Sequence, residues 1–337
     1  MKKSHYGYLL IIVSVSILSL SVGTSFAKDK LGVYEYVIRS AEGGFEQISD
    51  SLLTGIGNSE WELLATVNAG VPNDCSYRAR VFILYDSLFV SSIMNANRLT
   101  GPYSAVDRVI LFEDENGVHV SLVNHQSLDR TVLLDDESFD DNSKAQHEKL
   151  RDLVTANVEG TVSTKQYGQM RKKGYIGRTM GIMAGGDFDG KVKSIVTVKG
   201  GNLEDVAAKV RSGLGNKGKK WGIQLAFEVN LPGFDTVIFG VTGTPMDSKS
   251  FDIVGAGGDD SRNDFECAGI AHAGAYPLEV VAQSNDEGVS VSSVDAMYRM
   301  KVYFEDAGKW AFMKNMTMPG SIGSEISKLL KNVTKED

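Results

Sequence analysis

The sequence predicts an α+β protein made of two tandem β-α-β(4)-α units, with antiparallel sheets covered by helices on one face. The first observation is a hairpin pattern at residues 107–124 and again at 278–295, each with an acidic turn ending in glycine. The second is a helix exit of the form Gly-(Ile/Leu)-Gly-Asn, at 55–58 and 213–216, which leads to a tryptophan in both places. Because these features recur in the same order, we expect an internal duplication that forms a pseudo-dimer with a pseudo-twofold arrangement.

The first 27 residues have the composition of a Sec-type signal peptide. Lys2 and Lys3 give a basic start, residues 9–22 are apolar, and small residues precede the expected cleavage point after Ala27. An uncleaved membrane anchor is the competing interpretation, but the apolar stretch is short and contains serines. We therefore expect a periplasmic or secreted protein without a stable membrane anchor after cleavage.

The net charge argues against nucleic acid as a partner. Removal of Lys2 and Lys3 leaves 33 of the 35 basic residues against 43 acidic ones, a net charge of −10 for the mature chain. The phosphates of nucleic acids and of anionic membranes would repel such a chain. The partners that remain are a small apolar ligand or another exported protein. The negative net charge is also explained without any partner, because it keeps an exported protein soluble.

The first unit is expected at residues 28–160. In its second strand the alternation predicts that Trp61, Leu63, Ala65 and Val67 point inward. The expected elements are strands at 33–38, 61–67 and 80–85, a variable stretch at 86–103, the hairpin at 107–124, and helices that span 45–57 and 140–157.

The second unit is expected at residues 191–337, after a glycine-rich and partly basic connecting segment at 161–190. Asn202 is followed three residues later by Asp205, which predicts a capped helix. The expected elements are strands at 192–198 and 236–241, another strand that ends at 230, a Gly/Asp-rich loop at 255–264, the hairpin at 278–295, and a last helix at 321–332.

The second unit resembles the domain-of-unknown-function 302 family. The resemblance is carried by Val237–Val241, Pro277, Asp286–Gly288, Val289–Val291 and Asp295–Met297. It implies that both units have a fold similar to that of the TATA-binding protein, in a tandem arrangement. Many members of the family carry a cysteine after the proline, where this chain has leucine. The resemblance implies no reaction.

The two cysteines, Cys75 and Cys267, allow one disulfide in an oxidising compartment. Such a bond would close a long loop and join the two units. The alternative is two partly buried thiols, because cysteine behaves as a small apolar residue. Neither cysteine has the C-x-x-C spacing of a redox or metal site.

The pattern that points most directly to metal chemistry is a group of methionines. Met313, Met316 and Met318 precede the last helix, and thioethers select Cu(I), which favours a periplasmic Cu(I)-binding protein. The alternative is core packing, since methionine fills irregular gaps. The acidic clusters do not have the spacing of a calcium loop, so Ca²⁺ would bind only opportunistically. No histidine pair has a metal-ligand spacing, and His119 is expected on the surface.

No catalytic motif is present, so the favoured function is a non-enzymatic binding module for a small ligand or a protein. The candidate ligand-binding residues are Trp61, Trp221, Arg80 and Arg108. The alternative is an enzyme with a site between the two units, for which the candidates near the strand ends are Arg78, Arg80, Asp107, Arg108 and Glu279. Ordinary cross-strand pairing explains the same charged residues.

Overall fold

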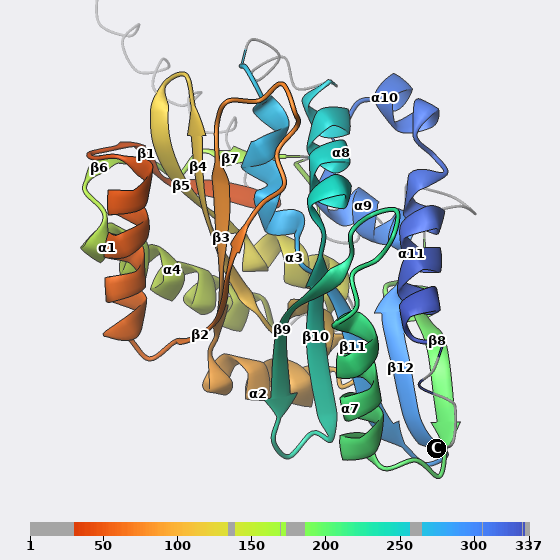
Figure 1. Ribbon diagram of the computed structural model, residues 1–337. Coiled ribbons are helices and arrows are strands. Elements are labelled where there is room, and N and C mark those ends of the chain that lie inside the picture. Colours follow the sequence, from red (N-terminus) through yellow and green to blue (C-terminus); the bar gives the residue numbers. More distant parts are fainter. Residues whose placement is uncertain are drawn as a thin grey trace, which may run out of the picture.

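The computed structural model describes residues 30–133, 139–168, 170–172, 186–256, 265–304, 306–331 and 333. The expected signal peptide lies outside these residues, as do the acidic clusters at 135–137 and 259–260. The described part is an α+β protein with two antiparallel sheets, which confirms the predicted fold class (Figure 1).

The first unit contains one antiparallel sheet whose strands follow the order β2-β3-β4-β5-β1-β6, with β7 also paired to β1. Its strands are β1 (Tyr34–Ala41), β2 (Glu62–Asn68), β3 (Ala79–Tyr85), β4 (Asp107–Asp114), β5 (Gly117–Val123), β6 (Gly160–Val162) and β7 (Gln166–Tyr167). Its helices are α1 (Phe45–Gly57), α2 (Ser87–Ala96), the 3-10 helix η1 (Gly101–Ser104), α3 (His125–Val132) and α4 (Asp140–Asn157).

The second unit contains a sheet with the order β9-β10-β11-β12-β8. Its strands are β8 (Val192–Lys199), β9 (Gln224–Leu231), β10 (Thr236–Thr242), β11 (Leu278–Asn285) and β12 (Gly288–Val294). Its helices are η3 (Asp189–Lys191), α7 (Leu203–Leu214), α8 (Thr244–Gly255), η4 (Ala268–Ala275), α9 (Ala296–Phe304), α10 (Lys309–Lys314) and α11 (Met318–Leu329).

The two units repeat one topology. The order β2-β3-β4-β5-β1 in the first sheet corresponds strand for strand to β9-β10-β11-β12-β8 in the second. Both hairpins turn at a glycine with positive φ, Gly117 at 120° and Gly288 at 141°, as a tight hairpin turn requires. Asn202 caps α7, because its side-chain oxygen accepts from the backbone N–H of Glu204 and of Asp205, at 2.8 and 3.4 Å.

Alternating side chains place the first sheet between two cores. Val109 and Leu111 of β4 pack with α1 and α4 on one face, and this face forms a core of its own. Ile110 and Phe112 point to the opposite face, where they join a core that continues into the second unit. Since apolar residues of both units share this second core, the units fold against each other rather than as separate domains.

Each unit packs a short 3-10 helix against the sheet of the other. η4 of the second unit packs on β3 and β4 of the first, and η1 of the first unit packs on β11 of the second. The hydroxyls of Tyr103 in η1 and Ser292 in β12 are 3.0 Å apart. The edge strands β2 and β9 lie side by side in the middle of the molecule (Figure 1). This exchange produces the pseudo-twofold arrangement.

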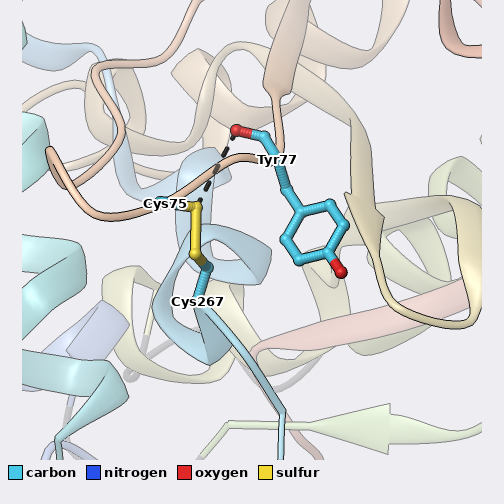
Figure 2. The surroundings of a disulfide bond; sticks show 3 residues. All are labelled: Cys75, Tyr77 and Cys267. Carbon is cyan, nitrogen blue, oxygen red and sulfur yellow. Dashed lines mark hydrogen bonds between the residues drawn. A yellow bond between two sulfur atoms is a disulfide. The ribbon is translucent and has the colours of Figure 1, made fainter.

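A disulfide joins Cys75, in the loop between β2 and β3, to Cys267, which precedes η4 (Figure 2). The Cα atoms are 5.6 Å apart, and the cysteines are separated by 192 positions in the sequence. The bond therefore links the two units beside the place where η4 crosses onto the first sheet.

The second strand departs from the predicted alternation. Leu63 has 38% of its surface exposed, and no residue of β2 is fully buried. The pairing of β2 with β3 shifts register between Leu63 and Ala65. Such a bulge changes which face the following residues occupy, so a strict alternation cannot hold across it. The variable stretch that follows β3 is also more regular than expected, since it contains α2 and η1.

The connecting segment expected at 161–190 is partly incorporated into the first sheet. β6 pairs with Ile38–Ala41 and β7 with Tyr34–Glu35, so both cover the outer edge of β1. Arg171, expected in a solvated basic run, is buried and donates to the carbonyl of Val302 at 2.7 Å. The last helix begins at Met318, three residues earlier than expected.

The prediction that His119 lies on the surface is wrong. The side chain is 2% exposed, and Nε2 lies 2.8 Å from Oδ1 of Asp114. Nδ1 accepts from the backbone N–H of Ser40 at 3.1 Å. His119 is the cross-strand partner of Phe112, so it lies on the face of the sheet that packs against the second unit, and its polar atoms are satisfied internally.

Candidate ligand-binding site

The two tryptophans expected to bind a ligand instead connect elements within their own units. Trp61 is buried and its Nε1 donates to Oδ2 of Asp107 at 3.1 Å. Trp221 is half-buried and its Nε1 donates to Oγ of Ser321, in α11, at 3.0 Å. Neither lines the pocket described below.

Arg78 and Arg80 both contact Glu46 of α1 near the surface of the first unit. Arg80 donates to Glu46 at 2.8 Å and to Asn68 at 2.8 Å. Arg78 pairs with Glu46 and with Glu113, both at 2.9 Å. These two arginines are therefore engaged with protein carboxylates.

Arg108 and Glu279, which lie 171 positions apart, meet in the core between the units. Nη2 of Arg108 donates to Oε1 of Glu279, and both side chains are almost fully buried. Arg299 of α9 completes the cluster, because its Nε donates to Oε2 of the same carboxylate at 3.0 Å. Burial alone would raise the pKa of Glu279, but the guanidinium groups of Arg299 and Arg108 outweigh burial and hold the pKa below its ordinary value.

Arg108 and Glu279 occupy the same position in the two copies. β4 and β11 have the same register relative to their turns, because Asp114 pairs with Gly117 and Asn285 pairs with Gly288. Counting back from these turns makes Arg108 equivalent to Glu279. The pseudo-twofold axis therefore passes close to this ion pair.

Beside the cluster of Arg108, Glu279 and Arg299, the second unit contains a pocket of about 490 Å³. It lies between strands β8, β11 and β12 and helices α9 and α11. That volume is within the usual range for sites that bind small molecules. Glu279 and Arg299 form part of its wall, together with Lys193 and Asp295. The larger part of the lining is apolar, and six of its contributors are Ile195, Met297, Met300, Phe304, Met316 and Ile322.

The equivalent space in the first unit is filled by a buried polar cluster. Asp107, His125 and Asp129 occupy the positions that Leu278, Ala296 and Met300 occupy in the pocket. Nε2 of His125 lies 2.8 Å from Oδ1 of Asp107, and Gln146 of α4 donates to the other oxygen at 2.8 Å. The two copies have therefore diverged at the place where one of them is hollow.

The environment of His125 keeps its imidazole charged. Burial lowers the pKa of an imidazole, but the carboxylates of Asp107 and Asp129 more than compensate and raise it to about 10. Asp129 also accepts from the hydroxyls of Ser104 and Ser143. The members of the cluster bond to one another, so in the first unit they fill the space that the pocket leaves open in the second.

The packing of the last helix explains why only the second unit is hollow there. In the first unit α4 is tied to β1, because Arg151 donates to Glu35 and His147 lies 3.3 Å from the same carboxylate. Lys193 stands on β8 at the position of Glu35, and its Nζ donates to the carbonyl of Gly190 at 2.9 Å. Among the described residues no ion pair joins α11 to β8.

The methionines proposed for copper lie in different environments. Met318 is buried, whereas Met313 and Met316 are 46% and 41% exposed. Only Met316 of these three lines the pocket, where Met297 and Met300 accompany it. Over the described ranges, no group of three His, Cys, Asp or Glu side chains could hold a metal ion. A search of the same ranges found no helix of the length and apolarity that a membrane span needs.

Sequence reasoning missed Arg299 and the pocket as a whole. The lining comes from β8, β11, β12, α9 and α11, which no local pattern connects. One available signal was the opposite charge of Arg108 and Glu279 at equivalent positions of a repeat.

Comparisons with known proteins add little to this description. No protein-family model matches the chain. No curated protein matches it either. Among solved structures, the chain is similar to the uncharacterized conserved protein DUF302 from Bacillus stearothermophilus, with 11% identity and a TM-score of 0.32. That likeness covers 37% of this chain and 98% of the other. It is too distant to assign an activity.

Proposed function

We propose that the chain is a non-enzymatic binding protein that holds a small, largely apolar ligand in the pocket of its second unit. The observation that carries the proposal is the contrast between the copies: the same space is filled by ion pairs in the first unit and hollow in the second. An apolar pocket with a few polar groups on its wall is the usual form of a small-molecule site.

The sequence motifs support two further parts of the proposal. The motifs around Val237–Val241 and Pro277 suggest that each copy is a member of the domain-of-unknown-function 302 family, in tandem. The predicted signal peptide suggests that the ligand is met outside the cytoplasm.

Gly323 provides a way to fill the pocket without disturbing the fold. It lies in α11 and lines the pocket, and a Cβ added there would meet nothing within 4 Å. Leucine is also a better helix former than glycine by roughly 0.8 kcal/mol, so the variant Gly323→Leu should fold at least as well. Gly57→Leu is the matched control, because Gly57 ends α1 in the first unit and a Cβ there is equally unobstructed.

The test is a fluorescence titration with Nile red, a neutral apolar dye. The unmodified protein should bind the dye saturably at one site, Gly323→Leu should bind it at least about tenfold more weakly, and Gly57→Leu should be unchanged. Equal binding by Gly323→Leu and the unmodified protein would place the dye elsewhere and would count against the proposal. Native mass spectrometry of protein from its own host would then identify what the pocket carries.

A further inference from the structure

We infer that the ligand of this pocket is a single-chain amphiphile with an anionic head, a carboxylate or a phosphate, and that the head binds Arg299. The inference rests on the proposed binding function and adds the chemical class of the ligand. It is drawn from the charge balance of the buried cluster, from the free donor of Arg299, and from the apolar remainder of the pocket.

The buried cluster holds more positive than negative charge. Two guanidinium groups, from Arg108 and Arg299, share the single carboxylate of Glu279. The relative exposure of the three residues is 0%, 7% and 3% respectively. Because the pKa of Glu279 is held low and arginine stays protonated, the cluster carries a net charge of +1. An unbalanced buried charge is costly, and an anion in the adjacent pocket would relieve that cost.

Arg299 offers a donor to such an anion. Its Nε and Nη2 are used, since Nη2 donates to the carbonyl of Pro277 at 3.2 Å and to Glu279 at 3.3 Å. Among the described residues Nη1 has no acceptor, and it is not among the polar atoms closed off from solvent. The ring of Tyr303 lies 4.3 Å from the guanidinium carbon and helps to fix the group. A fixed guanidinium is well suited to carboxylate or phosphate oxygens.

The other two charged groups on the pocket wall, Asp295 and Lys193, are less suited to bind a buried anionic head. Asp295 caps α9, because its Oδ1 accepts from the backbone N–H of Met297 and of Tyr298, both at 3.1 Å. The positive end of the helix dipole stabilises its carboxylate there. Nζ of Lys193 donates to the carbonyl of Gly190 and keeps two further donors, but Lys193 is exposed, so water and salt weaken its attraction for an anion. Arg299 is therefore the buried cation on the pocket wall that has a spare donor.

The rest of the pocket suits a flexible hydrocarbon chain. Met297, Met300 and Met316 contribute thioether side chains that adapt to irregular shapes. Phe304 and Ile322 add rigid apolar surface. A polar ligand without an apolar body would leave this surface in contact with water, so the inference excludes small inorganic anions as the main occupant.

The experiment compares four ligands with the same twelve-carbon chain by isothermal titration calorimetry: dodecanoate, dodecyl phosphate, dodecanol and dodecyltrimethylammonium. All are used below the concentration at which they form micelles. The unmodified protein should bind at least one of the two anions about tenfold to a hundredfold more tightly than dodecanol, and the cation more weakly still. The two anionic arms decide between carboxylate and phosphate.

The variant Arg299→Gln should lose this preference and still bind dodecanol, because Arg108 continues to pair with Glu279. Arg211→Gln is the control, since Arg211 pairs with Glu228 on the surface of α7. Should Arg299→Gln not fold, the pKa of bound carboxyl-labelled dodecanoate can be measured in the unmodified protein by NMR. A bound pKa below that of the free acid supports the inference, and a raised one overturns it.

The outcomes separate the two proposals. Binding of dodecanol and of the anions with equal affinity would overturn the anionic head and leave the binding function standing. Tighter binding of the cation would overturn it as well. If none of the four ligands binds and Nile red does not bind either, the binding function itself is wrong.

Discussion

Replacing Glu279 by glutamine should destabilise the protein by about 3–5 kcal/mol, the usual cost of breaking a buried ion pair by removal of one partner. The glutamine amide has nearly the same shape, so little packing is lost. What remains are the guanidiniums of Arg108 and Arg299, both more than nine-tenths buried, without a carboxylate between them. Since the carboxylate joins residues of both units, its loss weakens their association directly.

The assay is urea unfolding at pH 7, with Glu228→Gln as the control. Glu228 pairs with Arg211, whose side chain is 52% exposed, and such a surface pair contributes at most about 1 kcal/mol. If Glu279→Gln costs no more than Glu228→Gln, the buried cluster does not stabilise the interface as argued. The triple variant Arg108→Met, Glu279→Leu, Arg299→Met should recover part of the loss, because no lone charge then stays in the buried cluster.

The same carboxylate predicts a dependence on pH. The pKa of Glu279 in the folded protein lies below the ordinary value of 4.5. Its contribution is therefore complete above pH 4.5 and is lost as the pH falls through the lower, folded pKa. The difference in unfolding free energy between the unmodified protein and Glu279→Gln should shrink on acidification below pH 4.5, and a difference that grows there would contradict the assignment.

Three further predictions concern stability. Reduction of the Cys75–Cys267 disulfide, or the double serine variant, should lower the unfolding free energy by about 2–5 kcal/mol, because the bond closes a loop of 192 positions; an unchanged urea midpoint would refute this. Burial raises the pKa of Asp247 to about 7, so stability should fall as the pH rises from about 4 to 7, and Asp247→Asn should flatten that slope. Asp107 and Asp129 raise the pKa of His125 to about 10 despite burial. The contribution of charged His125 to the unfolding free energy should therefore be complete below pH 6.5 and lost as the pH rises through 10. The variant His125→Gln should show no such loss.

Features with a local cause could be predicted from the sequence. The hairpins followed from turn glycines, and the cap of α7 followed from Asn202, because each depends on residues within a few positions. The duplication followed from repetition of these local signals. α2 was missed because serines and β-branched residues obscure its helical pattern, although Asp86 caps it by accepting from the backbone N–H of Leu88 at 3.0 Å.

The candidate site could be predicted only in part. Arg108 and Glu279 were identified as candidates from their places near strand ends, and Met316 from its thioether. Their roles could not be predicted, because they depend on how the two units pack. Arg299 gave no local signal at all, since a basic residue in a helix is ordinary until the helix is placed beside Glu279.

The contact between Arg108 and Glu279 has a consequence for how the chain can have arisen. The two residues hold one equivalent position on either side of the pseudo-twofold axis. In a true homodimer of either copy, that position would face itself, and the meeting would be arginine against arginine or glutamate against glutamate. Like charges in a dry interface repel strongly. The present copies can therefore form this interface with each other but not with themselves, so each half now depends on the other for its partner.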